Sequence, residues 1–232
     1  MKLILLAFII FFVLVSSCTV VNNMYVNDPV PAGKGNLKGY IGLGSGITPR
    51  IDSIADNGTV YRQNRYKLAP NLCLGVQAGL GKQTDLRVAL NLPYIIAGTG
   101  IRAGIQHSFF QKENPFNIAL LTDAGIVFSK DSLFGKSLEN PMKNTINGDF
   151  ALPLSYSFGP ESRIILTPRA SFNAIYIRDN INRSKTKAYT PFIPSITLGV
   201  KLHRIYFEAG IHSVNQQLFP NFGMAYIISV NK

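Results

Sequence analysis

Residues able to do acid–base or nucleophilic chemistry are few in this chain, and they are widely spaced. Of the three histidines, His203 falls in a short turn and His107 on the outward face of the strand pattern set out below. His212 has Ser213 beside it, but neighbours on a strand point to opposite faces. Glu208 is about 13 Å from His212 along the strand. Catalysis needs a nucleophile, a base and an orienting group within hydrogen-bond reach, so the sequence predicts no catalytic residues, no enzyme and no metal site.

The N-terminus carries a targeting signal. Lys2 is followed by 13 apolar residues, Leu3 to Val15, which as a helix are about 20 Å long and too short to cross a bilayer. The sequence Val15-Ser16-Ser17-Cys18 that follows resembles the lipobox of bacterial lipoproteins. The resemblance implies that residues 1–17 are a cleaved signal peptide and that Cys18 is acylated, with palmitate or a similar chain. This covalent lipid is the only cofactor that we predict. The alternative is an ordinary secretory signal that leaves Cys18 as a free thiol.

Residues 18–35 lack helical or strand periodicity and contain two prolines and two glycines, so we predict a lipidated tether. From residue 36 to residue 232 apolar residues alternate with small or polar ones. This pattern predicts an all-β fold, an antiparallel up-and-down transmembrane β-barrel of about ten strands. The predicted strands are residues 37–47, 70–80, 86–93, 98–111, 116–128, 148–158, 162–177, 189–202, 205–214 and 221–230.

The connections and the two strand faces favour a membrane barrel over a soluble one. Short connections alternate with long polar ones, which is typical of transmembrane barrels whose termini share the short-turn side. Leu72, Leu74 and Val76 share one face, whereas Cys73 and Gln77 share the other with glycines. The solvated face of a soluble sheet would carry many Lys, Glu and Thr residues. A soluble lipocalin-like barrel or a sandwich remains the alternative, because those folds alternate too.

Two segments carry a family resemblance. Residues 74–90, with the Thr84-Asp85-Leu86-Arg87 opening of a strand, and the Gly-rich residues 98–106 resemble hairpins of small outer-membrane barrel proteins of gram-negative bacteria. The resemblance implies architecture only. From the transmembrane-barrel pattern and the lipobox-like signal we expect the chain in the cell outer membrane, lipid-anchored, with its N-terminus in the periplasm.

Prolines run against this pattern. Pro153, Pro168, Pro191 and Pro194 lie inside predicted strands, and a closed barrel has no edge strand that tolerates a missing N–H. We therefore expect bulges or breaks at these positions.

Charged residues fall on the face that would line the lumen. Folding the hairpins about their short turns places Arg102 diagonal to Asp123, and diagonal neighbours are within reach of long side chains. These charges form either a selectivity ring or ligand site, or a polar plug that neutralises buried charge; we favour the plug. Two further diagonal pairs are Arg169 with Asp149 and Lys201 with Glu208. The full predicted set is Lys38, Arg87, Arg102, Arg169, Lys201, Asp123, Asp149 and Glu208.

The net charge of +11 is concentrated in the long connections, since residues 48–67, 130–143 and 178–187 are all net basic. In an outer membrane the nearest anions are lipopolysaccharide phosphates, so we expect outer-membrane lipids as partners. Nucleic acid is a poor alternative, because no recognition fold accompanies the charge. The predicted function is a lipid-anchored outer-membrane barrel with a structural or surface-interaction role. The alternative is a narrow pore for small solutes, and an outer-membrane hydrolase is less favoured still.

Overall fold

Alternation of apolar and polar side chains produces twelve β-strands in the part of the chain that the computed structural model describes. The described residues are 26–54, 60–93, 98–110, 113–129, 142–178, 186–190, 192–214 and 216–230. No helix among them is long and apolar enough to cross a membrane. The strands are β1 (Leu37–Ile54), β2 (Val60–Gly79), β3 (Thr84–Pro93), β4 (Gly98–Ser108), β5 (Phe116–Ser129), β6 (Met142–Ala151), β7 (Leu154–Gly159), β8 (Ser162–Arg178), β9 (Thr186–Tyr189), β10 (Phe192–Leu202), β11 (Ile205–Val214) and β12 (Gln217–Val230).

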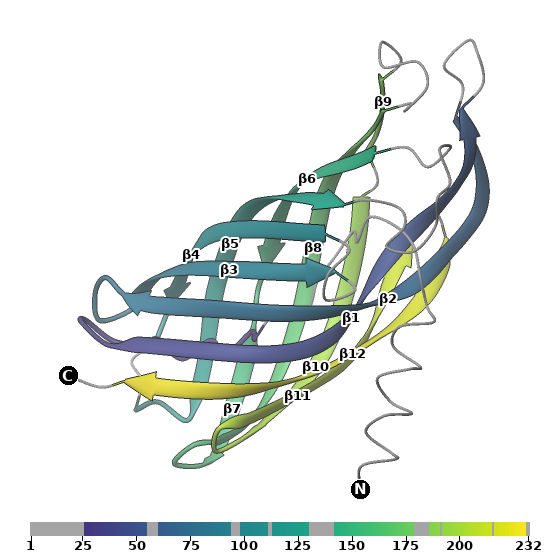
Figure 1. Ribbon diagram of the computed structural model, residues 1–232. Helices are drawn as coiled ribbons and strands as arrows, with labels where there is room; N and C mark the ends of the chain where they lie inside the picture. Colours follow the sequence, from purple (N-terminus) through teal and green to yellow (C-terminus); the bar gives the residue numbers. More distant parts are fainter. Residues whose placement is uncertain are drawn as a thin grey trace, which may run out of the picture.

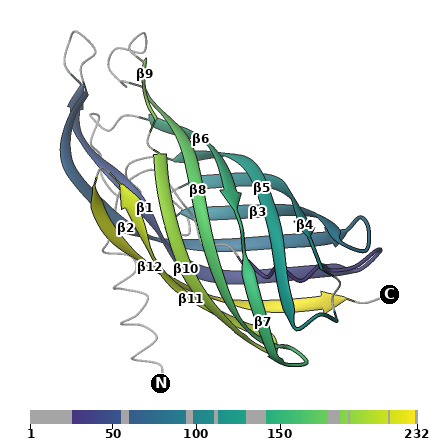
Figure 2. The same cartoon turned by 180° about the vertical axis from the view of Figure 1, so that it is seen from behind.

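The strands form one antiparallel sheet that closes on itself, because β1 pairs with both β2 and β12 (Figures 1 and 2). β6 and β7 lie end to end between β5 and β8 in one continuous register. β9 and β10 likewise lie end to end along β8. Counted this way the barrel has ten antiparallel strands, which confirms the predicted fold.

The two ends of the barrel differ. The β2–β3, β4–β5, β7–β8 and β10–β11 connections lie at one end, which we call the short-turn end. β1 begins and β12 ends there, and Leu37 pairs with Val230. We call the opposite end the long-loop end. In Figure 1 the short-turn end is at the left and lower left, and the long-loop end is at the upper right.

β1 and β2 are longer than predicted. We expected a loop over residues 48–69, but β1 continues to Ile54 and β2 begins at Val60. The two strands pair with each other through this region, with register shifts near Ile51. Because each strand satisfies the other's backbone groups, the hairpin can extend beyond the barrel wall without an apolar face. In Figure 1 it rises beyond β3, β4 and β5 at the long-loop end, as paired β8 and β9 also do.

The strand irregularities expected at the prolines occur at one position and are missing at two. Pro153 breaks the strand between β6 and β7, as expected. Pro168 and Pro194 lie within β8 and β10 with no register shift, so the expected irregularity is wrong there. The carbonyl of Pro168 accepts a hydrogen bond from the Leu152 backbone N–H, so the missing N–H of Pro168 faces the gap at Pro153. Pro191 lies outside the described residues.

The distribution of side chains is the reverse of that in a soluble protein, with apolar side chains outside and polar ones inside. Side chains such as Ile101 and Leu198 are exposed on the outer wall, while Arg102, Gln106 and His212 are almost completely buried in the lumen. Contiguous exposed apolar surface on this scale marks a membrane or partner-binding surface. The outer wall therefore has the character of a lipid-facing belt, and the lumen that of a polar core.

This polarity predicts a depth-dependent effect of charge on the outer wall. Leu198 lies in the middle of β10 and Leu202 at its last residue, and the two side chains are 53% and 45% exposed on the same face. We expect Leu198→Arg to cost about 2–4 kcal/mol of unfolding free energy in lipid, because the charge sits near the bilayer midplane, and Leu202→Arg about 0–1 kcal/mol. Denaturant unfolding in lipid vesicles measures both. Equal, near-zero effects would indicate a water-exposed wall.

Candidate functional site

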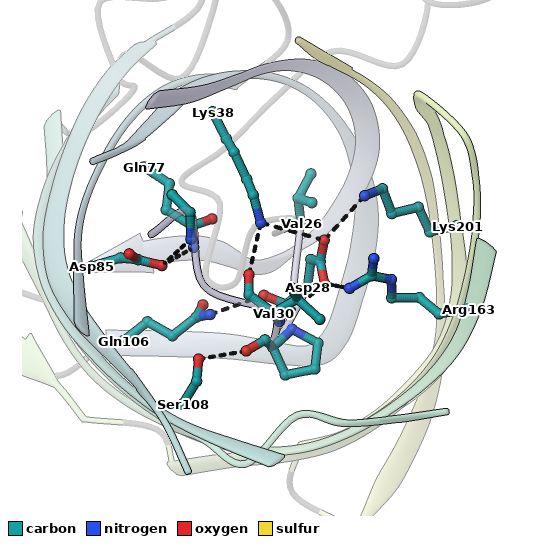
Figure 3. Close-up of polar contacts among 12 residues, drawn as sticks. Val26, Asp28, Val30, Lys38, Gln77, Asp85, Gln106, Ser108, Arg163 and Lys201 are labelled. Carbon is teal, nitrogen blue, oxygen red and sulfur yellow. Dashed lines mark hydrogen bonds and ion pairs between the residues drawn. The ribbon is translucent and has the colours of Figure 1, made fainter. Parts of the chain in front are cut away.

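Residues 26–35, which we call the plug segment, lie at the short-turn end, where residues 26–32 are buried in the lumen. Val26, Asn27, Asp28, Val30 and Ala32 are between 1% and 6% exposed. Figure 3 shows Val26, Asp28 and Val30 in the middle of the ring of strands. This placement differs from the tether predicted for residues 18–35. Residues 18–25, including Cys18, lie outside the described residues.

Glycines let the chain turn from the lumen into the wall. Gly33 and Gly35 have φ angles of 86° and 79°, in the left-handed region that side-chain-bearing residues rarely adopt. The Asn36 backbone N–H donates to the Gly33 carbonyl, and the Gly35 N–H donates to the Gly79 carbonyl, each at 3.0 Å. The turn therefore joins the plug segment to β1 and holds it against the end of β2.

Asp28 anchors the plug segment to three basic residues of the wall. Its Oδ1 lies 3.0 Å from Arg163 Nη1, and its Oδ2 lies 3.3 Å from Lys201 Nζ and 3.8 Å from Lys38 Nζ. The Val30 backbone N–H also donates to Oδ1, at 3.1 Å. The three cations come from β8, β10 and β1, so a single carboxylate ties strands from different parts of the barrel together (Figure 3).

The protonation of Asp28 follows from these neighbours. Burial alone would raise the pKa of this carboxyl, but the charges of Arg163, Lys38 and Lys201 outweigh it, and its pKa lies well below the ordinary value. A lowered pKa means that the stabilising charge is fully present above the ordinary titration range of a carboxyl and is lost only as the pH falls through the folded-state pKa. The Asp28 anchor is therefore charged at neutral and mildly acidic pH.

The plug backbone is also hydrogen-bonded to the wall. Buried backbone polar groups need partners, and in this segment the wall supplies them. The Ala32 N–H donates to Asp85 Oδ2 at 2.9 Å, and the same oxygen accepts a hydrogen bond from Gln77 Nε2. Four wall side chains donate to plug carbonyls: Arg87 to Val26 at 2.7 Å, Gln106 to Asp28 at 3.0 Å, Ser108 to Pro29 at 2.5 Å and Lys38 to Val30 at 2.7 Å.

A second charged cluster lies in the wall, closer to the long-loop end. Arg102 Nε donates to Asp123 Oδ1 at 3.0 Å, and Arg102 Nη2 contacts both Asp123 and Asp149. The side chains of the three residues are at most 4% exposed. The structure thus brings the predicted pair of Arg102 and Asp123 together and adds Asp149 to the same guanidinium, because β4, β5 and β6 are successive neighbours.

The predicted pair of Lys201 and Glu208 is arranged differently. Lys201 contacts Asp28 rather than Glu208, because the plug carboxylate lies at the short-turn end beside Lys201. Glu208 accepts a hydrogen bond from the Tyr206 hydroxyl at 3.1 Å. Arg169 is 8% exposed and its Nη2 lies 3.3 Å from Asn27 Oδ1. Its pairing with Asp149 stays a prediction.

Sequence reasoning missed Asp28, Asp85 and Arg163. Asp85 lies just before the predicted strand of residues 86–93, and Arg163 near the start of the predicted strand of residues 162–177, and the strand pattern assigns neither a luminal role. A signal for Asp28 was present: the predicted luminal charges leave a surplus of two positive charges, and Asp28 is the single acidic residue in 19–35. That surplus could have pointed to a segment entering the lumen.

The histidines lie apart from one another. His212 is 1% exposed in the lumen, while His107 contacts the Thr84 hydroxyl on the outer wall. His203 lies in the β10–β11 turn, 3.2 Å from Glu161. Across the described residues, no group of three or more His, Cys, Asp or Glu side chains is placed to hold a metal ion.

Closure of the sheet, the apolar outer wall and the buried polar lumen define a transmembrane β-barrel protein. Among solved structures, the attachment invasion locus protein Ail of Yersinia pestis is similar to this chain with a TM-score of 0.34 and 7% identity, over 84% of this chain and 99% of that chain. No family model and no curated protein matches the chain. The assignment to this class rests on strand pairing and polarity.

The Arg102 cluster predicts strong coupling between its members. Arg102→Ala leaves two carboxylates facing each other in a confined space, so we expect a loss of about 3–5 kcal/mol of unfolding free energy. Adding Asp149→Asn should restore about 1 kcal/mol or more of that loss. Denaturant unfolding in detergent gives the unfolding free energy of the wild type, the two single variants and the double variant. Arg204→Ala, in an exposed turn, is the control. Small and additive effects would contradict a structural cluster.

Because the plug segment contacts the end of β2, we predict that a side chain at Gly79 lowers the stability of the protein. A Cβ atom there would lie 1.8 Å from the Gly33 carbonyl oxygen, whereas a Cβ atom on Gly81 would meet nothing within 4 Å. We expect Gly79→Ala to cost about 1–3 kcal/mol, because backbone must shift, and Gly81→Ala to be close to neutral. Thermal unfolding in detergent compares the two variants. Equal stability would mean that the plug segment does not lie against β2.

Proposed function

We propose that this protein is a lipid-anchored barrel of the gram-negative outer membrane whose lumen is closed by its own plug segment. It acts through its structure and its surface loops, and neither conducts solutes nor catalyses a reaction. The observation that carries the proposal is the Asp28 anchor, a buried carboxylate held by Arg163, Lys201 and Lys38. A pore would need this part of the lumen to be open.

The width of the barrel supports a closed lumen. In eight-stranded barrels side chains alone fill the interior, so ten strands leave additional space. Here the plug segment occupies that space at the short-turn end. Further toward the long-loop end, the buried side chains of the Arg102 cluster fill part of the lumen. Both contributions favour a plugged interior over the narrow pore that we kept as the alternative.

Orientation in the membrane follows from the connections. Short turns of outer-membrane barrels face the periplasm, and long loops face outward. We therefore place the short-turn end, with the start of β1, in the periplasm. The basic connections at the long-loop end then face the lipopolysaccharide layer, whose phosphates are the proposed partners of the loops.

Lipid attachment at Cys18 is the remaining part of the proposal. Its support is the lipobox-like sequence Val15-Ser16-Ser17-Cys18. The chain between Cys18 and Val26 can span up to about 3.5 Å per residue, which is enough to connect the plug segment to a membrane leaflet. We keep the periplasmic leaflet as the proposed position of the lipid.

Conductance tests the closed lumen. Wild-type protein reconstituted in planar bilayers should show no steady ion conductance, whereas a variant with residues 26–32 replaced by a Gly/Ser sequence of equal length should conduct more. Lys34→Ala, at an exposed position of the same segment, is the control and should stay closed. A steadily conducting wild type would favour the pore, and a closed Gly/Ser variant would show that the wall alone seals the lumen.

Mass spectrometry of the mature N-terminus tests the anchor. We expect the first residue to be Cys18 with covalent acyl chains, because the small residues Ser16 and Ser17 precede it after a short apolar segment. Cys18→Ala should abolish acylation while leaving barrel folding unchanged. An unmodified Cys18, or a retained Met1, would refute lipid anchoring.

A further inference from the structure

The basic residues that hold Asp28 form a site that the barrel wall cannot satisfy by itself. Arg163 and Lys201 are direct cross-strand partners on β8 and β10, and both side chains are buried. Like charges directly opposite each other in a sheet are destabilising. Lys38 adds a third positive charge from β1. The anion that offsets these charges, Asp28, belongs to the plug segment and not to the wall.

A single carboxylate leaves this site with excess positive charge. Asp28 is the one carboxylate that contacts the three cations, and the charge of Asp85 also acts on Lys38, so three positive charges face two negative ones. The Arg163 Nε atom, also buried, has no hydrogen-bond partner in the part of the chain that the structure describes. The site therefore offers more charge and more donors than Asp28 uses. A phosphate group carries about 1.5 to 2 negative charges at neutral pH, with three strong acceptor oxygens, and matches such a site better than a carboxylate.

We propose that Lys38, Arg163 and Lys201 form a binding site for a phosphate-class oxyanion at the short-turn end of the lumen, and that Asp28 occupies it as an internal substitute ligand. An external oxyanion competes with Asp28 for the same cations. Binding therefore releases the main charged anchor of the plug segment. This inference deepens the proposed function and rests on it, since both require the plug segment to lie in the lumen.

The position of the site fits such competition. Lys201 and Arg163 each lie one residue inside the strand end at the short-turn end, next to the β10–β11 and β7–β8 turns. Lys38 is the second residue of β1 at the same end. A solute arriving from the short-turn side thus meets these cations before it reaches the Arg102 cluster. The hydrogen bonds from Arg87 to the Val26 carbonyl and from Gln106 to the Asp28 backbone carbonyl do not involve the Asp28 carboxylate, and they would hold the segment after its charged anchor is displaced.

The test removes the internal ligand and supplies inorganic phosphate. Asp28→Ala protein in detergent is heated with 10 mM phosphate or with potassium chloride of equal ionic strength. We expect phosphate to raise the melting temperature of Asp28→Ala by about 3 °C or more above chloride, the size expected for millimolar affinity. Wild-type protein should respond less, because Asp28 competes. Asp28→Asn, which keeps the shape of the side chain, is measured in parallel and should respond in the same direction.

Removal of the cations provides the control. Adding Arg163→Ala and Lys201→Ala to the Asp28 variants should abolish the difference between phosphate and chloride. The same response without the two cations, or no response in either Asp28 variant, would overturn the oxyanion site. These outcomes are independent of conductance: a closed wild-type lumen with no phosphate response refutes this site alone, whereas an open wild-type lumen refutes the proposed function.

Discussion

Burial of charge in a confined lumen is the constraint on which this structure depends. Arg102, Arg163 and Lys201 point inward from an apolar-walled barrel, where an unpaired cation is costly. The molecule offsets this cost in two places. Asp123 and Asp149 flank Arg102 within the wall, and Asp28 reaches Arg163 and Lys201 from the plug segment. The second solution requires a piece of chain outside the sheet to become part of the core.

The barrel and the plug segment depend on each other in this arrangement. The wall supplies side-chain donors to plug carbonyls, and the plug supplies the carboxylate that contacts two opposed cations, Arg163 and Lys201. Gly33 and Gly35 allow the sharp turn that returns the chain to β1. Since the turn, the backbone hydrogen bonds and the charge pairs all favour one placement of the segment, the short-turn end is closed by a specific structure and not by loose chain.

The fold could be predicted from the sequence because period-two alternation is local and survives along each strand. The Arg102 and Asp123 contact could be predicted as well, since one short turn relates their strands. The plug segment could not, because it has no periodicity and its partners are remote: Asp28 is 135 residues from Arg163 and 173 from Lys201. The paired extension of β1 and β2 escaped prediction for a different reason, since a hairpin outside the apolar belt needs no apolar face. The polar residues of 48–69 therefore predicted a loop.

The central claim is that residues 26–32 are buried in the lumen of the folded protein. Thiol labelling tests it most directly, with single cysteines at Ala32, which is 2% exposed, and at exposed Lys34, two residues away, in protein carrying Cys18→Ala and Cys73→Ala. The account predicts that a maleimide reagent labels Lys34→Cys rapidly in folded protein, and labels Ala32→Cys only after denaturation. Equal and rapid labelling at both positions in the folded barrel would contradict it.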